Sequence, residues 1–182
     1  MLVLKFMAGG AAGLAVHESG HVATSAIFSA SPGTRPLNYA GIPFFAVTHH
    51  PVTRTKEFVI SSSGLWMQHA GSEWILTKRP NLRRESAPFL KGMFVFNTAT
   101  SAVYTAAAFG TFGPPERDTL GMAESLGQRG WREPVVGVFV LAPAALDVYR
   151  YFQPDQKWAA WASRGTKAIF MALVLFAGRP VS

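Results

Sequence analysis

The sequence contains no cysteine, which excludes disulfide bonds, thiolate metal sites and cysteine nucleophiles. Any metal ion bound by this chain must therefore be held by histidine and carboxylate side chains. Charged residues are also scarce, because they make up 15% of the 182 residues against 49% hydrophobic residues. That balance is unusually apolar for a water-soluble protein. It predicts a single membrane-embedded domain over residues 1–182.

The formal net charge is +7, from 17 Lys and Arg against 10 Asp and Glu. A basic chain can bind nucleic acid, but these bases form no patch with interleaved aromatic side chains. We therefore expect no nucleic-acid partner. The bases lie mainly between apolar blocks, where they set the orientation of a multi-pass protein in the lipid bilayer.

Five largely apolar segments are long enough to form membrane helices: 2–28, 58–76, 94–112, 135–152 and 158–177. They predict an all-α fold, a polytopic membrane helical bundle of about five transmembrane or membrane-embedded helices. The run 42–47 is too short to span a bilayer. We expect a hairpin or a re-entrant piece at the membrane surface there.

The charges of the connections predict the orientation in the membrane. Segment 78–91 carries five bases and one acid, and segment 150–167 carries four bases and one acid, whereas segment 113–133 has more acids than bases. We therefore place the N-terminus and the first two of these segments in the cytoplasm. The expected location is the bacterial inner (plasma) membrane, as an integral multi-pass protein.

The first apolar segment contains the motif His17-Glu18-Ser19-Gly20-His21. Residues four apart project from one face of a helix, so the two histidines can bind one tetrahedral Zn²⁺. Glu18 is then placed beside the metal, where it can accept a proton from an attacking water as the catalytic base. Ionisable residues inside an apolar span are costly, which favours a bound metal or a water-filled cavity around them.

Small residues share a helix face with the two histidines, at three- or four-residue steps: Gly9, Gly13 and Thr24. A second face of this kind is formed by Ser61, Gly64, Gln68 and Ser72. Small residues let helix backbones approach closely inside a membrane. We therefore expect both faces to look into the bundle.

The motif in an apolar helix resembles that of the site-2 protease family of intramembrane zinc metalloproteases. The stretch Ser61-Ser62-Ser63-Gly64 is similar to the small-residue region of that family's following helix. The resemblance implies hydrolysis of peptide bonds within or near the bilayer. It also implies a third zinc ligand, an aspartate from a later helix.

Two aspartates compete to be the third ligand. Asp147, in Pro143-Ala144-Ala145-Leu146-Asp147, is similar to the family's Pro and Leu-Asp pairing, but the predicted topology places it near the cytoplasmic end. Asp118 follows the third helix, which runs parallel to the first and ends on the motif's side of the membrane. Depth therefore favours Asp118, with Asp147 as the alternative. A water molecule, His49, His50 and Glu73 remain as further candidates for the third ligand.

Other polar positions have simpler explanations. Asp118 can cap a helix over 120–126, and Asp147 can pair with Arg150. We expect His49 and His50 to be solvated residues of a loop. His69 and Glu73 are four residues apart on the second helix, so their side chains can pair with each other. Gln68 either makes a hydrogen bond between helices or binds a substrate backbone.

Three functions fit these features. The first is an intramembrane zinc metallopeptidase that cleaves a membrane or membrane-proximal polypeptide in an extended conformation. The second is a non-catalytic subunit of a larger membrane complex that keeps a metalloprotease-like zinc site. The third is a zinc hydrolase acting on a lipid or another small amphiphile. An open fourth coordination position would distinguish a catalytic site from a structural one.

Overall fold

The computed structural model describes residues 1–39, 41–127 and 130–176. In these residues, six α-helices, one 3-10 helix (η1) and a two-stranded hairpin follow one another: α1 (Leu2–Ile27), β1 (Gly33–Tyr39), β2 (Ile42–Thr48), α2 (Arg54–Lys78), η1 (Leu82–Arg84), α3 (Pro88–Gly110), α4 (Asp118–Ser125), α5 (Arg132–Phe152) and α6 (Lys157–Phe176). The chain is thus mostly helical, as the sequence predicts.

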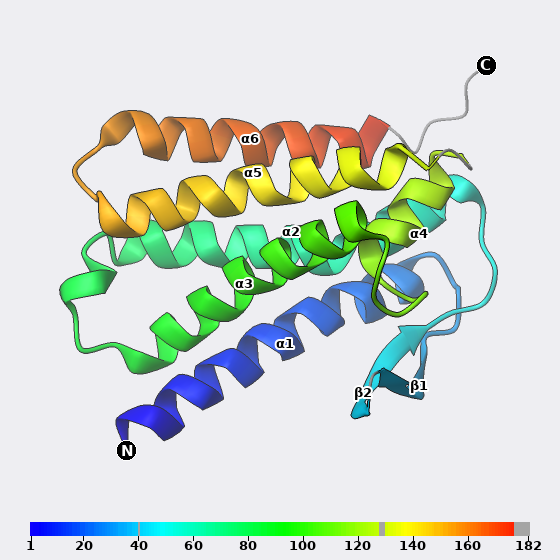
Figure 1. The fold of residues 1–182 in the computed structure, drawn as a ribbon, viewed down its shortest axis with the longest axis horizontal. Helices are drawn as coiled ribbons and strands as arrows, with labels where there is room; N and C mark the ends of the chain where they lie inside the picture. Colours follow the sequence, from blue (N-terminus) through cyan, green and yellow to red (C-terminus); the bar gives the residue numbers. More distant parts are fainter. Residues whose placement is uncertain (40, 128–129, 177–182) are drawn as a thin grey trace.

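The five long helices form an elongated bundle (Figure 1). α1 packs against α2 and α3, α3 packs against α5, and α5 packs against α6. α1, α3 and α6 run in one direction, while α2 and α5 run back. The N-terminus, the α2–α3 connection and the α5–α6 connection therefore lie at one end. The hairpin and α4 lie at the other.

Helix boundaries differ modestly from the predicted ones. α2 begins at Arg54 and α3 at Pro88, four and six residues before the apolar runs that marked them. Proline is favoured in the first turn of a helix, since the missing N–H is unbonded there in any case. Ala177, the predicted end of the last helix, lies outside the described residues.

Small residues bring α1 and α3 into backbone contact. A Cβ atom on Gly9 would collide with the carbonyl oxygen of Phe89, and one on Gly92 would collide with that of Phe6. Gly9, Gly13, His17, His21 and Thr24 are all buried. The predicted small-residue face of the first helix is therefore confirmed as a packing face.

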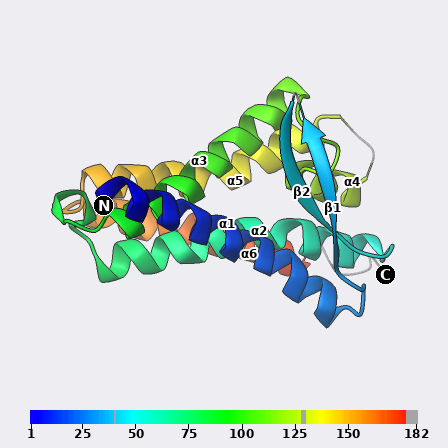
Figure 2. The same ribbon diagram turned by 90° about the horizontal axis from the view of Figure 1, so that it is seen from below.

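The segment 33–48 forms an antiparallel hairpin, which agrees with the first of the two structures expected for it. Thr34 pairs with Val47 and Arg35 with Ala46. Figure 2 shows the hairpin crossing from the end of α1 toward the end of α3. It is fixed there because the Gly113 amide donates a hydrogen bond to the Tyr39 hydroxyl (2.9 Å), and Arg35 pairs with Glu116.

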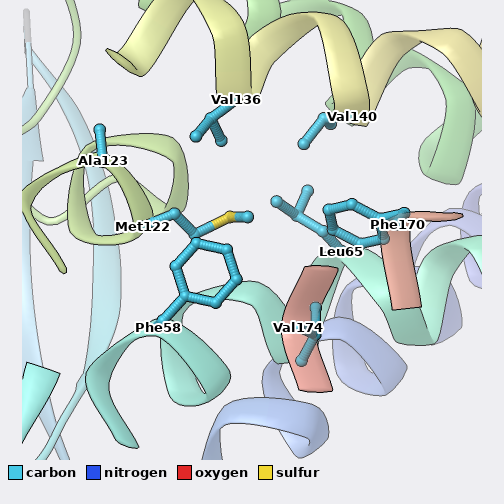
Figure 3. Close-up of a cluster of buried hydrophobic side chains, with 8 residues drawn as sticks. All are labelled: Phe58, Leu65, Met122, Ala123, Val136, Val140, Phe170 and Val174. Carbon is cyan, nitrogen blue, oxygen red and sulfur yellow. The ribbon is translucent and has the colours of Figure 1, made fainter. Parts of the chain in front are cut away.

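The apolar core lies where α2, α4, α5 and α6 meet (Figure 3): Phe58, Leu65, Met122, Ala123, Val136, Val140, Phe170 and Val174. Two helices of the described chain, α5 and α6, are long and apolar enough to span a membrane. The other long helices carry buried polar residues that interrupt their apolar runs, such as Gln68 on α2 and Asn97 on α3.

Candidate metal centre

Three buried side chains from two helices converge at the hairpin end of the bundle. The Nε2 atoms of His17 and His21 lie 3.2 Å apart on α1. The Oδ2 atom of Asp118, the first residue of α4, lies 3.2 Å from Nε2 of His17 and 3.4 Å from Nε2 of His21. Together they form a group that could bind a metal ion.

A backbone contact fixes the orientation of the His21 ring. Its Nδ1 lies 2.8 Å from the carbonyl oxygen of Ile60, and the Ser63 hydroxyl is 3.3 Å from the same nitrogen. A carbonyl oxygen can only accept, so Nδ1 carries a proton, and this bond turns Nε2 toward Asp118. Hydrogen bonds of this kind are typical of metal-binding histidines, which they orient.

Close approach of α2 to the histidines depends on Gly64. A Cβ atom on Gly64 would lie 2.5 Å from Cε1 of His17 and 2.5 Å from Nε2 of His21. A Cβ atom on Gly20 would in turn lie 2.8 Å from the carbonyl oxygen of Ser63. Residues 61–64 of α2 therefore pack directly against the histidine side of α1, and only glycine fits at position 64.

Glu133, in the first turn of α5, holds the segment that carries Asp118. Its carboxylate accepts two hydrogen bonds from Arg117, at 2.6 and 2.8 Å, and a third from Thr119 at 3.0 Å. The residues on both sides of Asp118 are thus tied to α5, which directs the Asp118 side chain toward α1. The sequence did not lead us to predict a role for Glu133, although a carboxylate at the start of an apolar helix could have indicated one.

Asp118 begins α4 and does not cap it, because the N-cap is Arg117. The cap suggested from the sequence is therefore wrong. Burial alone would raise the pKa of the Asp118 carboxyl, but the imidazoles of His21 and His17 hold this pKa well below its usual range. The carboxylate thus faces the histidines in its ionised form, as a metal ligand requires.

A cavity of about 430 Å³ opens onto the group. Its polar wall includes Glu18, which is partly buried and lies next to His17 in the chain. The remaining wall is largely apolar and comes mainly from α3, the segment 112–117, β1 and four consecutive residues of β2: Phe44, Phe45, Ala46 and Val47. The predicted base therefore shares one cavity with all three candidate ligands.

Asp147 lies in a different site. Its carboxylate, on α5, accepts hydrogen bonds from Ser163 at 2.7 Å, Lys167 at 2.8 Å and Arg150 at 3.2 Å. The expected pairing with Arg150 is confirmed. The structure does not bring Asp147 to the two histidines. The alternative prediction that Asp147 is the third ligand is therefore wrong.

The remaining candidates also lie apart from the histidines. Glu73 binds Arg150 at 2.5 Å and Lys167 at 2.8 Å, and these cations take the place of the expected partner His69. His49 lies 3.5 Å from Glu57, so it is not simply a solvated loop residue. The side chain of Gln68 is fully buried, without a hydrogen-bond partner among the described residues.

Comparison with known proteins places the chain in no family: no protein-family model, curated protein or solved structure matches it.

Proposed function

We propose that this protein is an intramembrane zinc metallopeptidase, with Zn²⁺ held by His17, His21 and Asp118 and with Glu18 as general base. One observation carries the proposal. Ligand atoms of a tetrahedral zinc with bonds of about 2.0–2.1 Å lie roughly 3.3 Å apart. The three donor atoms are separated by 3.2, 3.2 and 3.4 Å. This spacing matches three corners of such a tetrahedron.

Three protein ligands and an adjoining cavity are the features of a catalytic zinc site, since structural sites use four protein ligands. When bound, zinc would act as a Lewis acid toward a carbonyl group and lower the pKa of water. Glu18, on the cavity wall, accepts the proton that the attacking water loses and can return it to the leaving amine. The resemblance to site-2 proteases supports the same assignment.

The hairpin favours a polypeptide substrate. β2 pairs with β1 along one edge, and in the described chain no third strand covers its other edge. An extended segment in the cavity would lie along residues 44–47 and expose its peptide bonds to the candidate metal centre, which a helix would not do. A small amphiphile would use no strand edge, so this feature favours a peptide.

A location in the membrane fits the surface of the bundle. Only 39% and 22% of the most apolar windows of α5 and α6 are buried, whereas a core helix of a soluble protein is mostly buried. We infer that all five long helices are embedded, with the N-terminus in the cytoplasm, because the two basic connections lie at its end of the bundle.

The decisive variant is Glu18→Gln. Glutamine keeps the size of the side chain but does not act as a base, so cleavage of membrane polypeptides should fall by about a hundred- to ten-thousandfold while zinc stays bound. The assay follows proteolysis of candidate membrane polypeptides by purified wild type and variant in vesicles, with metal content measured on the same samples. The contrary result is that every tested substrate behaves alike with wild type and with Glu18→Gln. The protein would then be better explained as a non-catalytic subunit than as a peptidase.

A further inference from the structure

A second cavity, of about 380 Å³, borders the apolar core between α2, α4, α5 and α6. Nine of its ten lining residues are apolar: Phe58, Met122, Leu126, Trp131, Val135, Val136, Phe139, Phe170 and Leu173. Four of them, Phe58, Met122, Val136 and Phe170, also belong to the apolar core drawn in Figure 3. The tenth residue is Arg132.

The lining of this cavity follows one face of α5. Arg132, Val135, Val136 and Phe139 are spaced at i, i+3, i+4 and i+7, so they form a stripe about 10 Å long. Val135 is 41% exposed and Phe139 is 37% exposed. The cavity is therefore a groove that opens on the outer surface of the bundle, with a cation at the helix start and apolar side chains along its length.

Arg132 is held beside Trp131 and Gly127. Its Nη1 is fully enclosed and has no hydrogen-bond acceptor among the described residues. The guanidinium carbon lies 5.7 Å from the centre of the Trp131 ring, and Gly127, with φ at +109°, leaves space for Nη1 where a Cβ atom would lie 2.4 Å away. Arg132 is partly buried and lines the groove, and a guanidinium with an unpaired Nη1 in that position favours an anionic ligand.

We propose that this groove binds one anionic phospholipid, with an acyl chain along α5 and the phosphate at Arg132. The size of the groove argues against a transmembrane helix. A helix about 10 Å wide fills on the order of 800 Å³ per 10 Å of length, about twice the groove. Tryptophan and arginine at the start of a membrane helix match the headgroup level, with the chain continuing into the apolar region. The proposal rests on the membrane location and not on the metal centre.

The test is native mass spectrometry of the detergent-solubilised protein, titrated with phosphatidylglycerol or phosphatidylcholine of identical acyl chains. We expect one retained lipid and about a tenfold preference for phosphatidylglycerol, because both lipids carry the phosphate but only phosphatidylcholine adds a choline cation, which Arg132 repels. Arg132→Gln should remove the preference while a lipid still binds. Val135→Trp should fill the mouth of the groove and abolish both. Arg54→Gln, an exposed arginine at the same end, should change neither.

Equal retention of the two lipids by wild type would overturn the proposal, as would a retained preference in Arg132→Gln or full binding in Val135→Trp. Palmitate that binds more tightly than phosphatidylglycerol would identify a fatty-acid site instead and also overturn it. Zinc content and peptidase activity are measured in parallel, so that loss of the groove and loss of the metal centre are distinguishable.

Discussion

Individual residues at the candidate metal centre are fixed by neighbours that contribute no ligand. The His21 ring is oriented by the carbonyl group of Ile60, and Asp118 is turned toward the histidines by the contacts of Glu133 with the residues on either side of it. Gly64 supplies the space in which both imidazoles lie. The donor atoms therefore stand at metal-binding distances because of packing around them.

Gly64→Ala tests this dependence. The added methyl group would lie 2.5 Å from the His17 and His21 rings and must displace them. We expect zinc affinity to fall by roughly ten- to hundredfold, as for other changes around metal ligands. Competition with a chromogenic chelator measures this. The matched control is Gly165→Ala on α6, where nothing lies within 4 Å of the new atom. Equal affinities in the two variants would refute the packing argument.

Among the elements, the hairpin has the most direct link to the proposed function. β2 contributes four consecutive residues to the cavity, whereas β1 contributes only Leu37 and Tyr39. The hairpin is tied to the 112–118 loop by the Tyr39 hydroxyl and by Arg35. It therefore lines the cavity next to the candidate metal centre, and under the proposed function an extended substrate would lie along the outer edge of β2.

Phe45→Glu places a charge on this cavity wall. Burying an unpaired carboxylate against an apolar substrate is costly, so kcat/KM for peptide cleavage should fall at least about tenfold, while zinc content stays at the wild-type level. Thr34→Glu is the control, because Thr34 is exposed on β1 and does not line the cavity. Unchanged cleavage by Phe45→Glu would show that substrate does not contact β2.

At the scale of the whole molecule, the candidate metal centre and the ionic cluster of α2, α5 and α6 lie at different levels along the bundle (Figure 1). The cluster joins Glu73 and Asp147 to Arg150, Arg164 and Lys167. Glu73 lies near the end of α2 and Asp147 near the end of α5, and both helices run away from the hairpin. Under the proposed orientation, the cluster lies toward the cytoplasm and the metal centre toward the outer side.

Single cysteines test this orientation cleanly, because the chain has none of its own. Asn81→Cys should react with an impermeant maleimide only from the cytoplasmic side, and Glu124→Cys only from outside. Both side chains are exposed and lie at opposite ends of the bundle. Gln128, which follows α4 in the sequence, lies outside the described residues. The reverse labelling pattern would show that the proposed topology is inverted. It would not contradict the candidate metal centre.

Local rules made much of this architecture predictable. The histidine pair and the small-residue face of α1 depend only on helical spacing, and Asp118 was favoured because the first and third helices run in parallel. Contacts distant in sequence were not predictable. The hydrogen bonds that Arg117 and Thr119 donate to Glu133, and those that Lys167 donates to Glu73 and Asp147, each require tertiary packing. For the same reason, the sequence predicted only a helix-packing role for Gly64.

The zinc content of the purified protein, measured by mass spectrometry of the metal, tests the central claim most directly. Wild type should hold about one Zn²⁺ per chain, and the double variant His17→Ala/His21→Ala should hold none. Asp118→Asn should lose most of the metal. Asp147→Asn should keep it, although breaking the buried ionic cluster should lower stability by about 3 kcal/mol. Full zinc in the double variant or in Asp118→Asn would contradict the proposed metal centre.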